Sequence, residues 1–495
     1  MTFEAFQETV RTQRRSPSER LIVPMHRRRS ADLLTPVSAF LHLREGARMP
    51  FLLESVEGGE KLARYSFLGR NPYRTVTARG RETTSRDAAG AVTEHDQDLF
   101  SVLDALITEY REVRLPDLPR LTGGAVGFFG YDCIRLIESI PDRHAPDGDI
   151  PDAVWAFYDT VCAFDHVKHQ LVLIRSVFVD PNADLRTLWE GAVRDLDAME
   201  TLFSAPSRPS PDPVRLEGEW RSNMSRETFE QAVDRAKHYI REGDIFQVVL
   251  SQRFSTGYSG DPFNLYRALR QVNPSPYLFY LDFGAFRLVG SSPEVLVRIE
   301  EGRAELLPIA GTRPRGATPE EDARLAEDLL ADRKERAEHL MLVDLGRNDL
   351  GRVSDWGSVE VERYAFIERY SHVMHIVSSV ASRLASDRHA MDALKACFPA
   401  GTVSGAPKVR AMEIIDELET TRRGPYAGAV GYLDFRGNLD TCITIRTMLV
   451  TDNTVHLQAG AGIVADSVPA NEYEETLNKA RALRTAMNVA ATDLL

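Results

Sequence analysis

Two Glu-x-x-Glu segments constrain the fold of this chain most strongly, because each stacks like charges that the fold must neutralise or expose. The first lies within residues 334–349, which we predict to form a helix. Asp332 can cap its start, and packing residues recur along it at Leu340, Met341, Val343 and Leu345. Glu335 and Glu338 then stand on one face of this helix.

The second segment repeats this arrangement near the C-terminus. Glu472 and Glu475 stand three residues apart, and Lys479 follows on the same face. Two such helices facing one another would offer the oxygen ligands that suit Mg2+. The alternative is an ordinary solvated face, which is common in a chain with 27% charged residues.

Length and charge restrict the class of protein. At 495 residues the chain is too long for one compact core and predicts about two to three domains. The net charge of -13 argues against nucleic acid or an anionic membrane as the main partner. No apolar run approaches a membrane span, and the N-terminus lacks the apolar segment of a secretory signal. Four scattered cysteines predict reduced thiols in a cytoplasmic protein: Cys133, Cys162, Cys397 and Cys442.

A Pro/Ser-rich stretch at residues 204–212 is the best candidate for a domain boundary. We therefore expect an N-terminal region of residues 1–203, a linker at 204–212 and a second domain of residues 213–495. The glycine-rich residues 121–132 fit no phosphate-binding pattern, and strand packing against close backbone is favoured there.

The second domain is predicted to contain several strands with informative polar residues. In a buried strand at residues 245–250, Gln247 faces opposite to Phe246 and Val248 and needs a partner or lines a site. A hairpin is predicted with strands at 426–435 and 441–450, and Arg446 in its second strand is either salt-bridged or holds an anion.

Two glycine-containing loops could bind anions. The loop at residues 398–408 superficially resembles a phosphate-binding loop, but its glycine spacing is one residue short and Lys408 does not directly follow Gly405. We therefore reject nucleotide binding there. After a strand at 455–458, the free backbone amides of residues 459–462 could receive a carboxylate.

Four motifs, at residues 308–313, 344–349, 398–408 and 459–462, together resemble the chorismate-utilising enzymes, most closely the members that form anthranilate. The resemblance covers residues 220–490 strongly and the N-terminal part more sparsely. It implies an α+β fold, in which a large chorismate-binding core of antiparallel sheets is packed between helices and carries the N-terminal regulatory region.

The resemblance also implies the site residues. Glu338 and Glu475 would bind Mg2+ directly, with Glu335 and Glu472 in the outer shell. Glu294 would protonate the departing 4-hydroxyl, and His375 would serve pyruvate elimination, although a lone histidine is more often structural. Thr312 is the third predicted catalytic residue. The substrate would be bound by Gly311, Thr312, Tyr426, Arg446, Gly460, Ala461, Gly462 and Lys479.

Two positions distinguish the reaction within the family. Family members that form isochorismate carry a lysine at the Gln247 position, and aminodeoxychorismate-forming members carry one before Gly311, where this chain has Ala310. The implied reaction is therefore Mg2+-dependent conversion of chorismate and ammonia to anthranilate and pyruvate, the first committed step of tryptophan biosynthesis. The sequence has no amidotransferase nucleophile segment, so ammonia would come from a separate glutamine amidotransferase subunit, in a heterotetramer of two large and two small subunits, or from free ammonium.

A tryptophan feedback site is implied by two further segments, for which a strand end and a proline-set turn are the ordinary interpretation. Its residues would be Leu53, Glu54, Ser55, Asn273, Pro274, Ser275, Pro276, Tyr277 and Leu278. The chain departs from some members of the family at residues 61–66, which leaves other effector contacts open. The alternatives are an aminodeoxychorismate or isochorismate synthase, or a non-catalytic sensor of tryptophan or chorismate.

Overall fold

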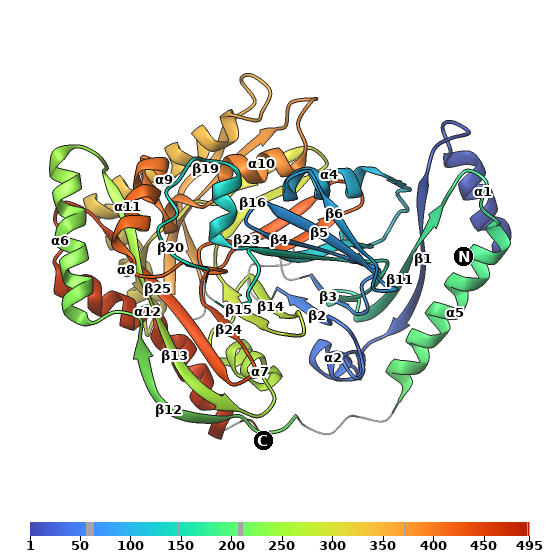
Figure 1. The fold of residues 1–495 in the computed structure, drawn as a ribbon, viewed down its shortest axis with the longest axis horizontal. Helices are drawn as coiled ribbons and strands as arrows, with labels where there is room; N and C mark the ends of the chain where they lie inside the picture. The colour runs from blue at the N-terminus through green and yellow to red at the C-terminus, as the bar shows by residue number, and fades with distance from the viewer. Residues whose placement is uncertain (56–63, 147, 206–210, 371–372, 493, 495) are drawn as a thin grey trace.

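The structure is a computed structural model that describes residues 1–55, 64–146, 148–205, 211–370, 373–492 and 494. Within these residues the strands form two large sheets of 13 and 12 strands. The sheets pack face to face over shared apolar clusters, and helices cover their outer faces (Figure 1). This arrangement confirms the expected α+β fold with antiparallel sheets between helices.

The first sheet contains residues from both ends of the chain. Its described pairings are antiparallel except that of β1 with β7. In spatial order its strands are β12 (Arg215–Ser222), β13 (Gln247–Ser259), β25 (Thr454–Ile463), β24 (Thr447–Val450), β15 (Arg287–Ser292), β14 (Tyr277–Asp282), β2 (Phe51–Glu54), β3 (Tyr65–Gly69), β10 (Thr160–Asp165), β11 (Gln170–Val179), β1 (Leu21–Ser30) and β7 (Arg111–Glu112), with β21 (Gly405–Ala406) beside β13.

The second sheet lies against the first and is likewise built from both parts of the chain. In spatial order its strands are β18 (Ile309–Pro314), β20 (Val373–Arg383), β17 (Arg303–Leu306), β16 (Val295–Glu300), β23 (Leu439–Ile443), β22 (Ala429–Asp434), β8 (Gly124–Phe129), β9 (Ala153–Tyr158), β4 (Arg74–Arg79), β5 (Glu82–Asp87) and β6 (Val92–His95), with β19 (Glu360–Arg369) beside β20.

The helices lie on the outside of this double sheet, with α1 and α5 at one end and α6 and α12 at the other (Figure 1). They are α1 (Phe3–Gln13), α2 (Pro36–Leu43), α4 (Leu99–Thr108), α5 (Leu185–Ser204), α6 (Arg226–Glu242), α7 (Phe263–Val272), α8 (Pro319–Ala331), α9 (Arg333–Gly351), α10 (Ala390–Cys397), α11 (Lys408–Leu418) and α12 (Pro469–Thr492), with short 3-10 turns η1 (Tyr131–Leu136) and η2 (Gly401–Val403).

Both sheets continue across the predicted domain boundary. Strand β2 of the N-terminal region pairs with β14, and β8 pairs with β22. Residues 206–210 of the predicted linker lie outside the described residues, and α5 extends to Ser204 on its N-terminal side. The two regions therefore share their sheets, while the division into regulatory and catalytic roles stays a prediction.

Helix α9 confirms the predicted helix of residues 334–349. The Asp332 carboxylate caps it by accepting hydrogen bonds from the amides of Lys334 and Glu335. The predicted packing face is wrong at Leu340, whose side chain is 55% exposed. His339 is buried there instead, with its Nε2 2.6 Å from the Ser378 hydroxyl.

Two strand predictions need correction. Phe246 precedes β13 and is 74% exposed, so its predicted burial is wrong, whereas Gln247 and Val248 are buried. The predicted second strand of the hairpin is interrupted after Ile443, because the chain crosses there from the second sheet into β24 of the first. Arg446 lies in this crossing with φ of 50°, not in a strand.

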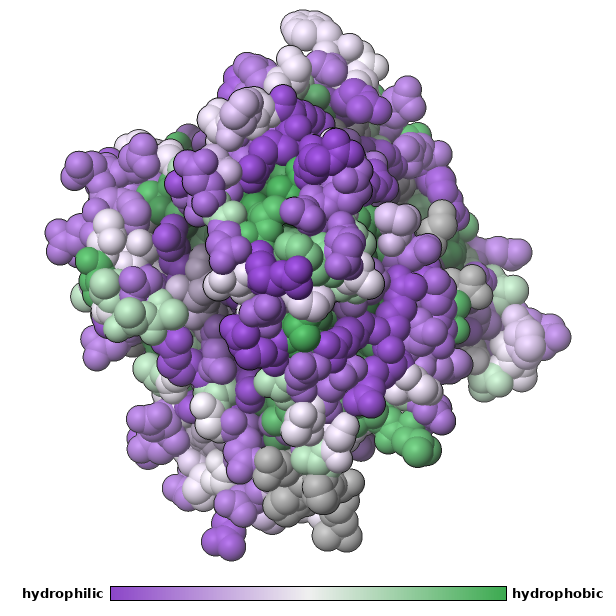
Figure 2. Space-filling view, turned by 90° about the vertical axis from the view of Figure 1, so that its right-hand side faces the viewer, coloured by the Kyte–Doolittle hydropathy of each residue, from purple (hydrophilic) through white to green (hydrophobic). Residues whose placement is uncertain are grey.

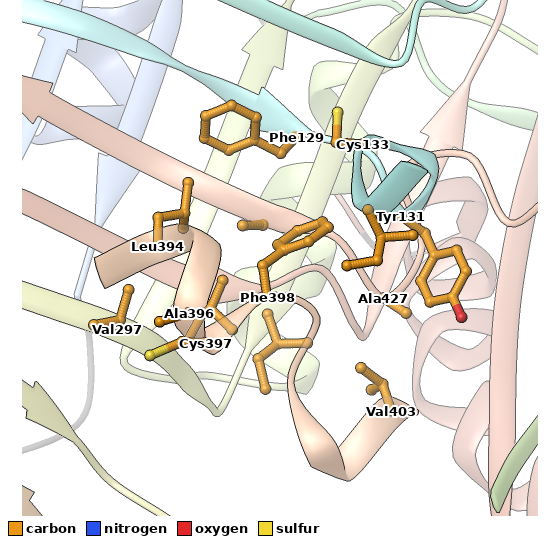
Figure 3. Close-up of a cluster of buried hydrophobic side chains, with 14 of the residues drawn as sticks. Phe129, Tyr131, Cys133, Val297, Leu394, Ala396, Cys397, Phe398, Val403 and Ala427 are labelled. Carbon is orange, nitrogen blue, oxygen red and sulfur yellow. The ribbon is translucent and has the colours of Figure 1, made fainter. Parts of the chain in front are cut away.

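The cysteines lie in the apolar core, and the surface is mixed in polarity. All four cysteines are buried and free, as predicted. Figure 3 shows Cys133 and Cys397 in an apolar cluster with Phe129, Phe398 and Val403. The face in Figure 2 is mainly hydrophilic and is interrupted by separate hydrophobic patches. No helix among the described residues is long and apolar enough to cross a membrane.

Candidate functional site

Two neighbouring crossings between the sheets carry Glu294 and Arg446. Glu294 lies between β15 of the first sheet and β16 of the second, and Arg446 lies between β23 and β24. The Ile443 amide donates to the Glu294 carbonyl at 3.0 Å, and the Ser291 amide donates to the Arg446 carbonyl at 3.1 Å. These main-chain hydrogen bonds hold an acid and a guanidinium side by side.

Arg446 is a candidate anion ligand. Its side chain makes no salt bridge with another described residue, although Arg446 is half-buried. Burial lowers its pKa, while the charges of Glu294 and the Tyr426 hydroxyl oppose this effect. A half-buried guanidinium that pairs with no described carboxylate favours the anion-binding alternative for this residue.

Glu294 is a candidate proton donor. Burial raises the pKa of its carboxyl, while the hydrogen bond from Thr402 and the charges of Lys479 and Arg446 lower it. The Thr402 hydroxyl donates to the Glu294 carboxylate at 2.9 Å. A carboxyl held between burial and nearby positive charge suits general acid catalysis.

His375 and Thr312 are brought together by a bulge at Gly311. Strand β18 slips in register against β20 between Ala310 and Thr312, and Gly311 has φ of 66°. The His375 Nδ1 donates to the Gly311 carbonyl at 2.8 Å and lies 3.1 Å from the Thr312 hydroxyl. Burial lowers the pKa of His375, so the ring is neutral and its Nε2 carries the lone pair.

Three further predicted residues lie near Glu294 and Arg446: Tyr426, Gly460 and Lys479. A side chain at Gly460 would meet the Tyr426 hydroxyl at 2.9 Å, so these two residues are in close contact. The Lys479 ammonium donates to the Gly460 carbonyl at 3.0 Å and pairs with Glu475 at 2.7 Å. Positive charge from Lys479 and Arg446 therefore surrounds the candidate acid.

Residues 459–462 lie within a longer strand than the one predicted at 455–458, and the expectation of free amides there stays a prediction. These residues belong to β25, which continues to Ile463 and pairs with β13 along this stretch. The pairing places Gly460 opposite Ser251 and Gly462 opposite Val249. The amides of Val249 and Ser251 donate to Ser404 and Glu419 and not to β25. Pairing with β24 on the other edge ends at Leu457.

The four glutamates of the predicted metal site form two pairs. The pKa of Glu335 is raised by burial and then by the charge of Glu338. That of Glu472 is raised by burial and then by Glu475, although a hydrogen bond from Ser467 opposes this. Because Lys334 also acts on Glu472, the starts of α9 and α12 are neighbours.

No cluster of three metal-ligating side chains forms among the described residues. The structure thus brings each predicted pair together but does not join the two pairs. The donor chemistry nevertheless fits Mg2+, because carboxylates that repel one another are stabilised by a hard cation between them.

Gln247 and Ala310 each adjoin a predicted substrate-binding residue: Gln247 lies near Gly462, and Ala310 precedes Gly311. Gln247 is buried, its Oε1 has no hydrogen-bond partner among the described residues, and its Nε2 would lie 2.7 Å from a side chain at Gly462. The prediction that Gln247 needs a polar partner or lines a site therefore still applies in the folded protein. Ala310 is buried and offers no nucleophile.

A second pocket contains both halves of the predicted effector site. Strand β2 pairs with β14, which sets Glu54 opposite Leu278 and Leu53 opposite Phe279. The pocket holds about 670 Å³ of space between protein atoms, including the part open to solvent. Six predicted effector residues line it: Leu53, Glu54, Ser55, Pro276, Tyr277 and Leu278.

The other effector residues lie beside this pocket. Asn273 and Ser275 bond with the Ser291 hydroxyl, and Ser275 also donates to the Ser292 carbonyl at 3.0 Å. Pro274 does not line the pocket. Of residues 61–66, the first three lie outside the described residues, while Tyr65 lines the pocket.

Several functional candidates were not predicted from the sequence. Thr402 lies in a loop whose motif indicated importance without indicating its contact with Glu294. Arg298 and Asp440 line the second pocket, where Asp440 accepts a hydrogen bond from Tyr277 at 2.7 Å. Strand alternation alone cannot identify such residues, because the local sequence does not distinguish a charged side chain that faces a pocket from one on the surface.

Residues 49–485 match the model of a protein family described as chorismate binding enzyme. The chain belongs to this family. Anthranilate synthase component 1 of Acetivibrio thermocellus is 49% identical to this chorismate-binding enzyme, over 95% of this chain and 96% of that protein. The corresponding protein of Synechocystis is 50% identical, over 94% and 96%.

Among solved structures, anthranilate synthase component I from Streptococcus pneumoniae has a TM-score of 0.75 and 40% identity, covering 92% of this chain and 98% of that one. The family and the fold expected from the motifs are thereby confirmed.

Proposed function

We propose that this chorismate-binding enzyme is the synthase subunit of an anthranilate synthase, a carbon-oxygen lyase that converts chorismate and ammonia to anthranilate and pyruvate. The convergence of Glu294 and Arg446, at the two sheet crossings, with His375 of β20 carries this proposal. It supplies a proton donor, an anion ligand and a neutral base in one site. The names of its relatives agree with this activity.

The cationic residues bind the two carboxylates of chorismate. Arg446 and the Tyr426 hydroxyl receive the enolpyruvyl carboxylate, and Lys479 adds positive charge at the ring carboxylate. Bound to Glu338 and Glu475, with Glu335 and Glu472 in its outer shell, Mg2+ would hold the ring carboxylate by charge.

The residues then move protons in two steps. Ammonia adds at C2 while the ring double bonds shift and the C4–O bond breaks, and Glu294 donates a proton so that the hydroxyl leaves as water. The amine loses a proton, which gives aminodeoxyisochorismate. His375 then takes the C2 proton through Nε2 as pyruvate leaves as its enolate, and the ring becomes aromatic.

Two side chains disfavour the sister reactions. The Gln247 amide cannot act as the base that activates water, which opposes isochorismate formation. Ala310 cannot attack the ring, which opposes the aminodeoxychorismate route. Each residue adjoins a predicted substrate-binding residue, so the choice of nucleophile is consistent with the walls of the site.

The deciding experiment incubates the purified chain with chorismate, Mg2+ and ammonium and follows anthranilate by its fluorescence. Glu294→Gln should abolish turnover, since an amide cannot donate the proton that a carboxylic acid donates. Glu300→Gln, at the far end of the β16 strand that follows Glu294, is the matched control and should remain active, because Glu300 is exposed. Isochorismate or aminodeoxychorismate as the product would refute the assignment, and chorismate binding without turnover would favour a sensor.

We further propose that Mg2+ is required. Removing divalent cations with a chelator should abolish turnover, and adding Mg2+ back should restore it. Full activity in the chelator would exclude the metal role of the glutamate pairs.

Tryptophan is the proposed effector, bound in the second pocket. Its aromatic lining and its charges of both signs, from Glu54, Arg298 and Asp440, suit an aromatic amino acid. Replacing Ser55 by a bulky residue should relieve inhibition by tryptophan while leaving turnover largely intact. Unchanged inhibition would remove Ser55 from the effector site.

The ammonia donor is proposed to be a separate glutamine amidotransferase subunit, in a heterotetramer of two large and two small subunits in the cytoplasm. The relatives are named component 1, which is consistent with a partner component. Glutamine-dependent turnover by the chain alone would contradict this partner.

A further inference from the structure

A buried ion pair lies beneath the candidate site. The side chains of Arg423 and Glu419 are 1% and 5% exposed. Arg423 Nε donates to one carboxylate oxygen of Glu419 at 2.9 Å, and its Nη2 donates to the other at 2.6 Å. This two-pronged geometry holds the planar guanidinium in one orientation.

Arg423 also binds the backbone of two segments that border the site. Its Nη1 donates to the Val403 carbonyl at 2.6 Å, and its Nη2 donates to the Val249 carbonyl at 2.7 Å. Val403 directly follows Thr402, whose hydroxyl holds the Glu294 carboxylate at 2.9 Å. The guanidinium is therefore one residue away from the group that binds the candidate acid.

The loop that contains Val403 is also held by apolar packing and by a backbone hydrogen bond to β13. Its Phe398 and Val403 side chains pack into the apolar cluster in Figure 3, beside Tyr131 and Ala427. The Val249 amide donates to the Ser404 carbonyl at 2.9 Å, so the loop is also bonded to β13. Arg423 joins this loop to β13, because its guanidinium donates to the backbone of both.

Glu419 completes the bridge to β13. One carboxylate oxygen accepts from the Ser251 amide and from its hydroxyl, both at 2.8 Å. The Gln458 amide in turn donates to the Ser251 hydroxyl at 2.8 Å. These bonds satisfy the charges, which offsets the cost of burying the pair.

Two aromatic rings flank the guanidinium. Its carbon lies 4.7 Å from the centre of the Tyr131 ring and 5.6 Å from that of Tyr426. Tyr426 presents its hydroxyl toward Gly460 in the substrate site. Arg423 therefore also packs against Tyr426, a second residue of the site.

A purely structural pair is the plain alternative. Buried ion pairs are often no better for stability than apolar residues of similar size, so stability alone explains this arrangement poorly. The Nη1 and Nη2 donors of Arg423 instead reach two segments that carry site residues. A fixed reacting geometry is what such a bridge contributes.

We propose that Arg423, held by Glu419, is a positioning residue for the reaction, which fixes the Thr402 loop and thereby the Glu294 carboxyl, together with the Tyr426 hydroxyl. The inference rests on the proposed function, because it assigns Glu294 the role of acid. It goes beyond that function by naming the groups that hold the acid in place.

The first test compares Arg423→Lys with Arg422→Lys. A lysine keeps the charge but cannot reach the three acceptors at once, so kcat should fall by about 10-fold or more while KM for chorismate changes by less than about 3-fold. Arg422 is the matched control because it bonds to Asp142 and His144, away from the loop. Its variant should keep the parental kcat.

A double-mutant cycle with Thr402→Val tests the route. If Arg423 acts through Thr402, the loss caused by Arg423→Lys should largely disappear in the Thr402→Val background. The alkaline limb of the kcat profile should also move to higher pH in Arg423→Lys, because the Thr402 hydrogen bond holds the pKa of Glu294 down. Additive losses with an unshifted limb would overturn the proposal.

Two measurements separate a failure of this inference from a failure of the proposed function. A crystal structure of Arg423→Lys should show the Thr402–Glu294 hydrogen bond broken, whatever reaction the enzyme catalyses, and an intact bond would overturn the proposal. If the lysine variant does not fold, millimolar guanidinium should restore turnover to Arg423→Ala where sodium chloride does not. Equal effects of the two salts would count against a positioning role.

Discussion

Glu112 should make the stability of this protein depend on pH near neutrality. The residue ends β7 and is only 6% exposed. The Thr122 hydroxyl donates to its Oε1 at 2.7 Å, whereas its Oε2 has no hydrogen-bond partner in the part of the chain that the structure describes. Arg436 lies 3.8 Å away but also pairs with Asp434.

The magnitude follows from the pKa. Burial, and then the charge of Asp434, raise the pKa of Glu112 from 4.5 to about 7, against the opposing effects of Arg436 and Thr122. This difference corresponds to about 3 kcal/mol. Because the folded protein holds this proton more tightly than the unfolded chain, the contribution of Glu112 to stability is highest below pH 4.5, falls as pH rises to about 7, and is level above it.

The test compares Glu112→Gln with the parent in urea unfolding at several pH values. The variant carries no titrating carboxyl here, so its free energy of unfolding relative to the parent should rise by about 3 kcal/mol between about pH 4.5 and pH 8. Glu94→Gln, at an exposed position of β6, is the control and should show no such trend. A constant difference between Glu112→Gln and the parent across this range would refute the argument.

Three further predictions concern the site and its supports. Gly460→Ala should lower kcat/KM by about 10-fold or more, measured with chorismate, because the new methyl group would lie 2.9 Å from the Tyr426 hydroxyl; unchanged kinetics would show that the tyrosine does not border the substrate. Glu475→Gln should require a higher Mg2+ concentration for half-maximal turnover, and an unaltered Mg2+ dependence would remove it from the ligands. Lys408→Met should lower stability by about 3 kcal/mol or more, since it leaves the Asp349 carboxylate buried without its partner at 2.9 Å; a thermal unfolding midpoint equal to that of the parent would contradict this.

Local chemistry predicted much of the fold and of the site. The Asp332 cap and the helical repeat predicted α9, and the glutamate pairs on α9 and α12 lie at neighbouring helix starts. Charge and packing repeat within a few residues in such elements, so the sequence contains their signal.

Other features depend on neighbours distant in the chain. Alternation predicted a continuous strand through Arg446, but the crossing between sheets is decided by pairing with β16 on one side and β25 on the other. The segment 344–349 likewise had no physical explanation in the sequence. In the structure Gly346 lies close to Leu306, and Asp349 pairs with Lys408 of the glycine-containing loop.

The continuity of both sheets across residues 204–212 makes the two regions depend on each other to fold. Separating them would uncover the edges of β14 and β22, which offer unpaired backbone groups to any other strand. Each half expressed alone should therefore aggregate, whereas the two halves produced together should reassociate as complementing fragments. A duplicated gene could not lose its N-terminal half by simple truncation, because β2 and β8 of that half also complete the sheets of the C-terminal half.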